Sequence, residues 1–454
     1  MATKQKRIVI IGGVAAGMSA ASRARRNDPN AEIIVYEKSN FVSYAACGLP
    51  YYISNDIKHS ENLIAINADT FRTERNIAVY LNHEALSFDP RKRLILIKDS
   101  IQGKEITETY DRLIIATGAH AFKPDIPGIN NNRVYCIKTL EESITVKNLI
   151  EHDNLQEAII AGGGYIGLEM AEALHKRGIH VKLIEMNDHL MPNIDKDLST
   201  HIEKHLIDQG CKIYTSSTIV SITHNGSRTT AQLGNGHEIS ADVVIWATGV
   251  RPNTQFATSG GVRLGTTGAI EVNSKMRTNV YNVFAAGDCA EVRNLVKNKP
   301  DYIPLGTTAN KQGRVAGDNA TGGVSHFRGV VGTAVVKVFD LEIARTGLTE
   351  AYLENLGLAY KSVNISGKSR AGYYPGAEDV HFKLLFSPVD GRIYGAQIIG
   401  REGAAKRIDT VALALHQKMT VQQLKDVDLS YAPPYAPVWE ALLIATNKAI
   451  KKLY

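Results

Sequence analysis

Short apolar runs recur along the chain, and two groups of them follow the same order. In the first group, an apolar run at residues 7–11 leads into a glycine turn, and an alanine-rich stretch over 18–26 predicts a helix. A second apolar run at 32–36 then ends in Glu37. Continuous apolar runs of this length are consistent with strands buried on both faces, as in a parallel sheet. The order therefore predicts a strand, a crossover helix and a second strand.

The same order returns in the middle of the chain. An apolar run at 158–161 precedes a glycine turn, a helix expected to reach Arg177, and an apolar run at 180–184 that ends in Glu185. An acid about twenty residues beyond the last glycine is the spacing of a dinucleotide-binding Rossmann fingerprint. Its first glycine permits the tight turn, its second lets the backbone approach a pyrophosphate, and its third lets the helix pack on the strand. Here these are Gly162, Gly164 and Gly167.

The first copy of the fingerprint is incomplete. It keeps the outer glycines, Gly12 and Gly17, but has Val14 in place of the middle one. Each copy is followed by an apolar strand that ends in Ala-Thr-Gly, at 113–118 and at 243–249. A glycine turn alone is often no more than a turn, but here the strand, the helix and the terminal acid are in register in both copies. Two copies predict that one chain binds two dinucleotides.

The later part of the chain changes character. Residues 282–290 predict a strand that ends in Gly287 and Asp288, at the strand end where ligands of α/β folds bind. A helix is expected to follow, through residue 320. From residue 329 onward, alternating apolar and polar positions predict antiparallel strands and two helices, which indicates an α+β domain. The expected strands are 335–339, 381–386 and 393–399, and the expected helices are 404–417 and 436–451.

Composition narrows the function classes. The chain has 454 residues, 44% of them hydrophobic and 22% charged, as in an ordinary soluble globular protein. A net charge of +6 is mild and favours anionic cofactors over nucleic acid. No apolar run is long enough to span a membrane, and the apolar stretch at 8–11 ends too soon for a signal peptide. Four cysteines without metal-ligand or CxxC spacing argue against a metal site and a disulfide scaffold, so a cytoplasmic protein is expected.

One cysteine has a distinctive setting. Cys47 lies in the run Ser-Tyr-Ala-Ala-Cys-Gly-Leu-Pro-Tyr, just after the first fingerprint unit. The residues that follow predict a helix that starts at Cys47, and a helix N-terminus would lower the pKa of the thiol from about 8.5. A redox thiol without a neighbouring cysteine would take its partner from the substrate. The alternative is a buried structural cysteine, which is the expectation for Cys136, Cys211 and Cys289.

Taken together, the two fingerprints, the two Ala-Thr-Gly strand ends, the Gly-Asp segment and the C-terminal α+β domain resemble the FAD-dependent pyridine nucleotide–disulfide oxidoreductases. The resemblance covers essentially the whole chain. It implies an α/β fold with two Rossmann-like domains, one for FAD and one for NAD(P)H, and a C-terminal domain that builds a homodimer. The implied boundaries are 1–120 and 256–325 for the FAD domain, 121–255 for the NAD(P)H domain, and 326–454 for the dimerisation domain.

The resemblance also implies a set of cofactor-binding residues. Gly12, Gly17 and Glu37 would serve FAD, with Asp288 on its ribityl chain. Glu185 and the second fingerprint would serve the nicotinamide dinucleotide. A carboxylate in that position binds the ribose 2′-hydroxyl of NAD and repels a 2′-phosphate, so NADH is favoured over NADPH. The further implied cofactor contacts are Val14, Ala15, Lys38, Ser43, Ala116, Thr117, Gly118, Tyr165, Ile166, Gly249, Pro304, Leu305 and Thr307.

Within this family, the segment around Cys47 looks like the single-cysteine branch, which includes coenzyme A disulfide reductases and NAD(P)H-dependent persulfide or polysulfide reductases. Residues 370–376 and 431–435 resemble the tyrosine motifs that reach into the partner subunit's active site in this branch. The match makes Tyr373 and Tyr431 catalytic candidates, since a phenol can protonate a departing thiolate. The alternative is that both tyrosines fill a dimer interface. Coenzyme A bound covalently at Cys47 is a further implication.

Two departures separate this chain from its relatives. Ala15 stands where water-forming NADH oxidases and NADH peroxidases of this branch carry a histidine, and Ala46 replaces an asparagine of some coenzyme A disulfide reductases. Three hypotheses stay open. The first is an NAD(P)H-dependent reductase of coenzyme A disulfide, persulfide or polysulfide, and the second is an NADH oxidase or peroxidase that cycles Cys47 through sulfenic acid. The third is a flavin and thiol redox sensor.

Basic residues supply candidate contacts to substrate phosphates. Coenzyme A carries a pyrophosphate and a 3′-phosphate, and such groups call for arginine forks. Pairs of basic residues three positions apart share a helix face. Taken singly, each is as well explained by a solvated basic surface. The candidates are Arg23, Arg26, Arg75, Lys311 and Arg314, together with Ser43 and Asn310.

Overall fold

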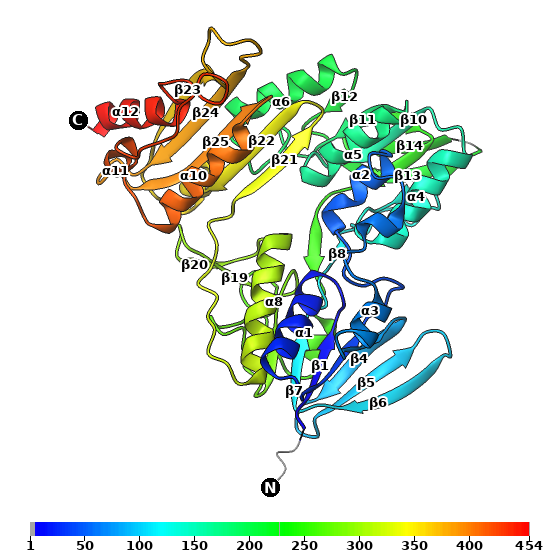
Figure 1. The fold of residues 1–454 in the computed structure, drawn as a ribbon. Helices are drawn as coiled ribbons and strands as arrows, with labels where there is room; N and C mark the ends of the chain where they lie inside the picture. Colours follow the sequence, from blue (N-terminus) through cyan, green and yellow to red (C-terminus); the bar gives the residue numbers. More distant parts are fainter. Residues whose placement is uncertain (1–4, 227, 454) are drawn as a thin grey trace.

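A computed structural model describes residues 5–226 and 228–453. Figure 1 shows three sheet-based units: the N-terminal unit at the bottom, a middle unit at the upper right and the C-terminal unit at the upper left. Among the described residues, no helix is long and apolar enough to cross a membrane.

The N-terminal unit is built on a five-stranded sheet in the order β18-β7-β1-β2-β3, with every neighbouring pair parallel. One of its strands, β18, comes from a segment far beyond the middle unit. An antiparallel sheet of three strands, β4-β5-β6, lies beside it. The elements are β1 (Arg7–Ile11), α1 (Ala15–Asn27), β2 (Glu32–Tyr36), α2 (Leu49–Ile53), α3 (Ala68–Thr73), β3 (Ala78–Tyr80), β4 (His83–Asp89), β5 (Leu94–Asp99), β6 (Lys104–Thr109), β7 (Arg112–Ile115), α7 (Gln255–Ser259), β18 (Val283–Ala285), β19 (Val292–Asn294), β20 (Lys299–Asp301) and α8 (Gly306–Thr321).

Two helices from distant parts of the chain close this unit. Helix α8 packs directly against α1, and glycines permit the close approach. A Cβ added at Gly313 would lie 2.2 Å from the carbonyl oxygen of Ala16, and one at Gly317 would lie 2.3 Å from that of Ala20. Backbone therefore meets backbone along this contact, and the chain after the middle unit returns to complete the first sheet and its helical cover.

The middle unit repeats the same plan. Its parallel sheet has the order β12-β11-β10-β16-β9, and a three-stranded antiparallel sheet, β13-β14-β15, lies beside it. Strands β8 (Ala119–Ala121) and β17 (Val250–Pro252) pair where the chain enters and leaves this unit. The elements are β9 (Val134–Tyr135), α4 (Leu140–His152), β10 (Glu157–Ala161), α5 (Tyr165–Lys176), β11 (His180–Ile184), α6 (Lys196–Asp208), β12 (Lys212–Tyr214), β13 (Ile219–Asn225), β14 (Arg228–Leu233), β15 (Glu238–Ala241) and β16 (Val243–Trp246).

The C-terminal unit is an antiparallel sheet in the order β21-β22-β25-β24-β23, with α10 and α12 packed against it. The last helix begins later than the sequence pattern predicts, at Ala441 instead of Ala436. Pro437 excludes Ala436 from the helix, because a proline disfavours helical backbone at the residue before it, and a bend at 438–439 then precedes the helix. The elements are β21 (Ala334–Val338), β22 (Leu341–Gly347), α9 (Glu350–Asn355), β23 (Lys361–Lys368), β24 (Asp379–Phe386), β25 (Ile393–Gly400), α10 (Ala404–His416), α11 (Val421–Lys425) and α12 (Ala441–Leu453).

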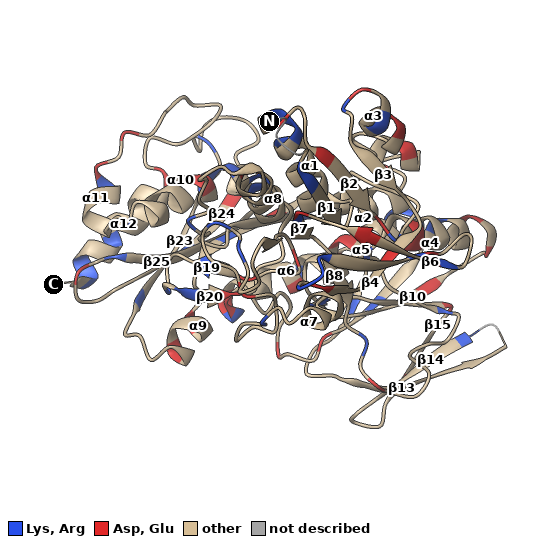
Figure 2. Cartoon of the chain, turned by 90° about the horizontal axis from the view of Figure 1, so that it is seen from below, with Lys and Arg blue, Asp and Glu red and all other residues tan. Residues whose placement is uncertain are grey.

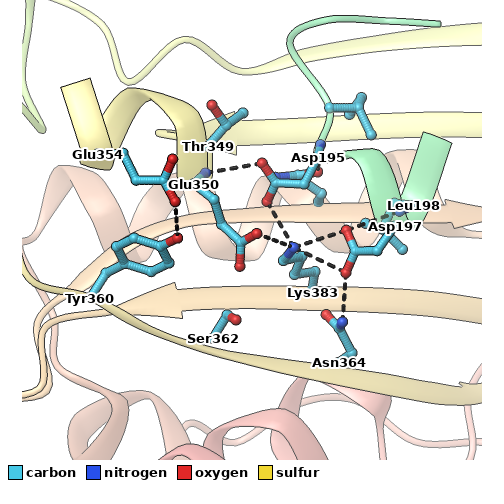
Figure 3. A network of polar contacts seen from close by, with 12 residues as sticks. Asp195, Asp197, Leu198, Thr349, Glu350, Glu354, Tyr360, Ser362, Asn364 and Lys383 are labelled. Carbon is cyan, nitrogen blue, oxygen red and sulfur yellow. Dashed lines mark hydrogen bonds and ion pairs between the residues drawn. The ribbon is translucent and has the colours of Figure 1, made fainter. Parts of the chain in front are cut away.

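A buried ion cluster joins the middle unit to the C-terminal unit (Figure 3). Lys383 of β24 is almost fully buried, and its Nζ lies 3.1 Å from Asp195, 2.9 Å from Asp197 and 3.0 Å from Glu350. Gln397 of β25 donates to the Asp195 carboxylate and accepts from the Asp195 backbone N–H, both at 2.7 Å. Asp195 and Asp197 belong to the start of α6, so one lysine of the C-terminal sheet fixes that helix in place.

Replacing this lysine should loosen the contact between the two units. In Lys383→Met three carboxylates lose their shared cation, and breaking a buried ion pair on one side typically costs about 3–5 kcal/mol. We expect a clearly lower urea midpoint, followed by circular dichroism. Lys406→Met, which changes a highly exposed lysine of α10, is the matched control and should leave the midpoint unchanged. Equal midpoints for the two variants would show that the cluster contributes no net stability.

Candidate functional site

The two glycine turns share the same backbone conformation and the same close packing. Gly12 and Gly162 both have φ of +104°, a backbone conformation that favours glycine. A Cβ at Gly17 would lie 1.8 Å from the carbonyl oxygen of Gly12, and one at Gly167 would lie 1.9 Å from that of Gly162. Only a glycine at the end of each turn lets the helix start directly on the strand. The outer glycines of both fingerprints are therefore explained by local packing.

The acid at the end of each second strand braces the turn. Glu37 is buried, and one carboxylate oxygen accepts from the backbone N–H of Gly13 at 2.7 Å. Glu185 is also buried and accepts from the N–H of Gly163 at 2.7 Å. The second oxygen of each carboxylate accepts from the backbone N–H two residues further on, at 2.9 Å and 2.8 Å. The outer oxygen of Glu185 also accepts from the side-chain N–H of Asn187 at 2.5 Å. The inner oxygen of Glu185 and both oxygens of Glu37 accept one hydrogen bond each, so they keep a lone-pair direction that a ribose hydroxyl can use.

Both helices that follow the turns begin without a side-chain cap. The N-cap residues are Val14 for α1 and Gly164 for α5, and neither provides a capping side chain. A Cβ added at Gly164 would meet no atom of the described chain within 4 Å. Uncapped N–H groups at the start of a helix bind anions readily, and a pyrophosphate is the anion that a dinucleotide presents. The residues present therefore fit a dinucleotide at each turn.

Asp288 lies beyond the end of β18, at the same edge of the sheet as the first glycine turn. Its carboxylate pairs with Lys138 of the middle unit at 3.1 Å, and its backbone carbonyl accepts from the hydroxyl of Tyr302 at 3.0 Å. The remaining predicted cofactor residues surround the two edges. Ala15 opens α1, Lys38 and Ser43 follow β2, Ala116, Thr117 and Gly118 follow β7, Tyr165 and Ile166 open α5, Gly249 follows β16, and Pro304, Leu305 and Thr307 lie at the start of α8.

Cys47 is the exposed cysteine of the four, and Cys136, Cys211 and Cys289 are buried as expected. The prediction that Cys47 starts a helix is wrong in detail, because it lies in a 3-10 turn at Ala46–Gly48 and α2 begins at Leu49. The prediction that the pKa of Cys47 is lowered is also wrong. Partial burial among neighbouring segments raises the pKa of the thiol, the carboxylates of Glu169 and Asp288 raise it further, and Lys138 opposes them.

Glu169 is a residue of this site that the sequence pattern did not single out. It lies on α5, four residues beyond Tyr165, and the hydroxyl of Tyr51 in α2 donates to its carboxylate at 3.4 Å. Burial raises the pKa of Glu169 to about 7, with a smaller contribution from Glu172 and an opposing one from the Tyr51 hydrogen bond. Figure 2 shows acidic residues on α5 beside α2. Its position one turn into the second fingerprint helix was the available signal.

The predicted substrate-binding basic residues line two separate hollows. Arg26 and Arg75 line a hollow of about 440 Å³ on the outside of α1, together with Arg25. Arg23 faces α8 and pairs with Asp318 at 2.9 Å, so its charge is largely compensated. Basic residues are also visible along α1 in Figure 2. The second hollow, about 260 Å³, is lined by Arg23, Lys311 and Arg314. Asn310 lies on α8, next to Lys311, and its side-chain oxygen accepts from the Ser19 hydroxyl. Ser43 lies in the segment after β2.

Tyr373 and Tyr431 form a pair in the C-terminal unit. Their hydroxyl oxygens lie 3.4 Å apart, and both side chains are exposed. The hydrogen bond with Tyr373 raises the pKa of Tyr431. Tyr431 belongs to the segment between α11 and α12, and Figure 1 shows these helices on the opposite side of the chain from α2, which follows Cys47. Within one chain, the tyrosine pair and Cys47 are therefore not brought together.

Comparison with known proteins gives a consistent result. Residues 6–313 match the family model described as pyridine nucleotide-disulphide oxidoreductase, and residues 333–442 match its dimerisation domain. An NADH oxidase of Methanocaldococcus jannaschii is 36% identical and aligns over 98% of this chain and 99% of its own. An NAD(P)H coenzyme A polysulfide/persulfide reductase of Pyrococcus horikoshii is 36% identical over 97% of each chain.

Two solved structures are similar over nearly the whole chain. The structure of reduced CoADR-RHD from Bacillus anthracis has a TM-score of 0.96 at 36% identity, covering 99% of this chain and 81% of that one. The structure of an NAD-dependent persulfide reductase from A. fulgidus has a TM-score of 0.95 at 39% identity, covering 98% of this chain and 83% of that one. The predicted fold class, with two Rossmann-type units and a C-terminal dimerisation domain, is thereby confirmed.

Proposed function

Because the chain belongs to the pyridine nucleotide-disulphide oxidoreductase family, we propose that it uses NAD(P)H and FAD to reduce a coenzyme A disulfide, persulfide or polysulfide through the single thiol of Cys47. The observation that carries this proposal is the state of the cysteines. Cys47 is exposed beside the cofactor edge, and the other three are buried. A resolving sulfur therefore has to come from the substrate, and the relatives named for coenzyme A sulfur compounds support that substrate class.

The chain supplies suitable residues for both cofactors. FAD would be held at the first glycine turn by the start of α1, with Glu37 on its ribose and Asp288 on its ribityl chain, and NAD(P)H would be held at the second turn by the start of α5 and Glu185. Bound there, FAD supplies two-electron transfer between the nicotinamide and sulfur. At the second turn, Gly164 faces open space and carries no Cβ, which leaves room for a pyrophosphate against the backbone.

Cys47 carries out the exchange with the sulfur substrate. Its thiolate attacks one sulfur of the coenzyme A disulfide, which forms a Cys47–S–S–CoA bond and releases one coenzyme A thiolate that takes up a proton. Two electrons then break the mixed disulfide, restoring the Cys47 thiolate and releasing a second coenzyme A, again with uptake of a proton. The sum consumes NAD(P)H and one further proton and yields two thiols.

The tyrosine pair belongs to a second copy of the chain in this proposal. The segment between α11 and α12 lies away from α2 in Figure 1, which supports a role for the hydroxyls of Tyr373 and Tyr431 at the thiol of the other subunit. The match to the dimerisation domain supports a homodimer. Either phenol would donate its proton to the departing coenzyme A thiolate. Arg26 and Arg75, which line the larger hollow, are the proposed partners of the coenzyme A phosphates.

An NADH oxidase activity is the second candidate, since one relative carries that name. Ala15 provides no histidine beside the cysteine for oxygen or peroxide chemistry. NADH consumption measured with and without coenzyme A disulfide, in air and under nitrogen, separates the two reactions. The proposal expects consumption that depends on the disulfide under nitrogen.

Cys47→Ser tests the single-thiol mechanism. Both dinucleotide turns are intact in this variant, so it should keep FAD and still reduce an artificial acceptor such as ferricyanide with NADH. Reduction of coenzyme A disulfide should be abolished. A serine variant that reduces the disulfide at the wild-type rate would disprove the mechanism.

Glu185→Gln tests the proposed preference for NADH. The amide keeps the size of the side chain and one of the two acceptor oxygens that brace the turn, and it removes the charge that repels a 2′-phosphate. We expect the ratio of kcat/KM for NADPH to that for NADH to rise by about tenfold. Glu37→Gln makes the same change in the first copy and should leave this ratio unchanged. A wild-type protein that prefers NADPH would contradict the assignment.

Tyr431→Phe tests the shared active site. Loss of a general acid typically lowers the rate about 10²–10⁴-fold, and this loss should appear in disulfide reduction while flavin reduction by NADH stays fast. Tyr435→Phe, a change to an exposed tyrosine four residues on, is the control and should have wild-type activity. Mixed dimers of Cys47→Ser and Tyr431→Phe chains should regain activity, because one of their two sites is intact. Full activity in Tyr431→Phe would show that the tyrosine pair fills the dimer interface and takes no part in catalysis.

A further inference from the structure

Three charged groups act on Cys47, and they are not equivalent. Asp288 and Lys138 lie 3.1 Å apart, so their opposite effects on the thiol largely cancel. Glu169 has no such partner, because within the described part of the chain no cation forms an ion pair with its carboxylate. Its contact is the neutral hydroxyl of Tyr51. The charge that decides the electrostatic environment of the thiol is therefore that of Glu169.

The other groups around Glu169 either have charged partners of their own or stay neutral. Glu172, one turn further along α5, is buried and contacts Lys337 of β21 at 2.5 Å and Lys176 at 3.0 Å, and it also accepts from the N–H of Phe339. Tyr51 stays protonated, since burial raises its pKa to about 12. Glu169 is consequently the group in this cluster that changes charge near neutral pH.

The geometry connects this carboxylate to the redox thiol. Cys47 and Tyr51 are four residues apart in the continuous helical segment formed by the turn Ala46–Gly48 and α2, so they share one face. Helix α5 packs on α2, and the Tyr51 hydroxyl points to Glu169 across that contact. The thiol, the phenol and the carboxyl group form one cluster at the junction of the first two units.

We propose that Glu169, held by Tyr51, is a positioning residue whose protonation state controls how readily the Cys47 thiol ionises. While Glu169 is neutral, the thiolate forms without a neighbouring negative charge. Once Glu169 has ionised, its carboxylate opposes a second negative charge on Cys47, so the thiol ionises less readily above the pH at which Glu169 loses its proton. This inference rests on the proposed role of Cys47 as the attacking thiolate.

Alkylation of the FAD-bound enzyme by iodoacetamide measures the thiolate directly, because the thiolate is the reacting form and the other three cysteines are buried. The rate would be followed by intact mass from pH 5.5 to 9.5, with no NADH or coenzyme A present. On a logarithmic scale, the wild-type rate should rise less steeply with pH around neutrality, where Glu169 ionises, than on either side of it. Glu169→Gln should give a simple one-proton curve, and its rate at pH 8 should be about threefold higher or more.

Two further variants make the result specific. Glu151→Gln removes a carboxylate from α4, which also packs on α2, and should leave the wild-type profile unchanged. Tyr51→Phe removes the hydrogen bond that favours ionised Glu169, so it should raise the rate near pH 8, and adding it to Glu169→Gln should change nothing more. Superposable profiles for wild type and Glu169→Gln, or additive effects of the two changes, would overturn the inference. Because no coenzyme A is present, that failure is distinct from a Cys47→Ser variant that still reduces coenzyme A disulfide, which would defeat the proposed function itself.

Discussion

The structure depends on one steric constraint, which is met twice: a helix must begin directly on the end of a parallel strand. At each turn a left-handed glycine reverses the chain, and a second glycine five residues on rests on its carbonyl oxygen, with less than 2 Å available for any Cβ. This arrangement turns the uncapped end of the helix toward the sheet edge and places a buried glutamate under the turn. Everything proposed about cofactors follows from these two edges.

The same close packing explains how separate parts of the chain form one site. Gly313 and Gly317 let α8 lie against α1, and this contact brings the segment after β18, with Asp288, to the edge of the first sheet. The Lys383 cluster fixes α6, and with it the middle unit, against the C-terminal sheet. Cys47 lies where the first two units meet, so charges from both units act on its thiol.

Much of the fold could be predicted from the sequence because its strands are short, continuous and apolar. Strands β1, β2 and β11 have the expected bounds, because each is a short, largely buried run that ends at its glycine turn or terminal acid. The site was harder to predict. The pKa of Cys47 depends on Lys138, Glu169 and Asp288, which lie 91 to 241 residues away along the chain and which local spacing does not connect to it. Arg23 and Arg26 both lie on α1, but Arg23 forms an ion pair with Asp318 of α8, a contact that helix spacing alone does not reveal.

The central claim is that one exposed thiol exchanges with a coenzyme A disulfide and needs no second thiol from the protein. The sharpest test is the intact mass of protein with a free Cys47 thiol and oxidised FAD after anaerobic mixing with coenzyme A disulfide, before any NADH is added, followed by mapping of the modified peptide. We expect one coenzyme A to be added per chain, at Cys47, and one coenzyme A thiol to be released. An unchanged mass, or an adduct on another cysteine, would contradict it.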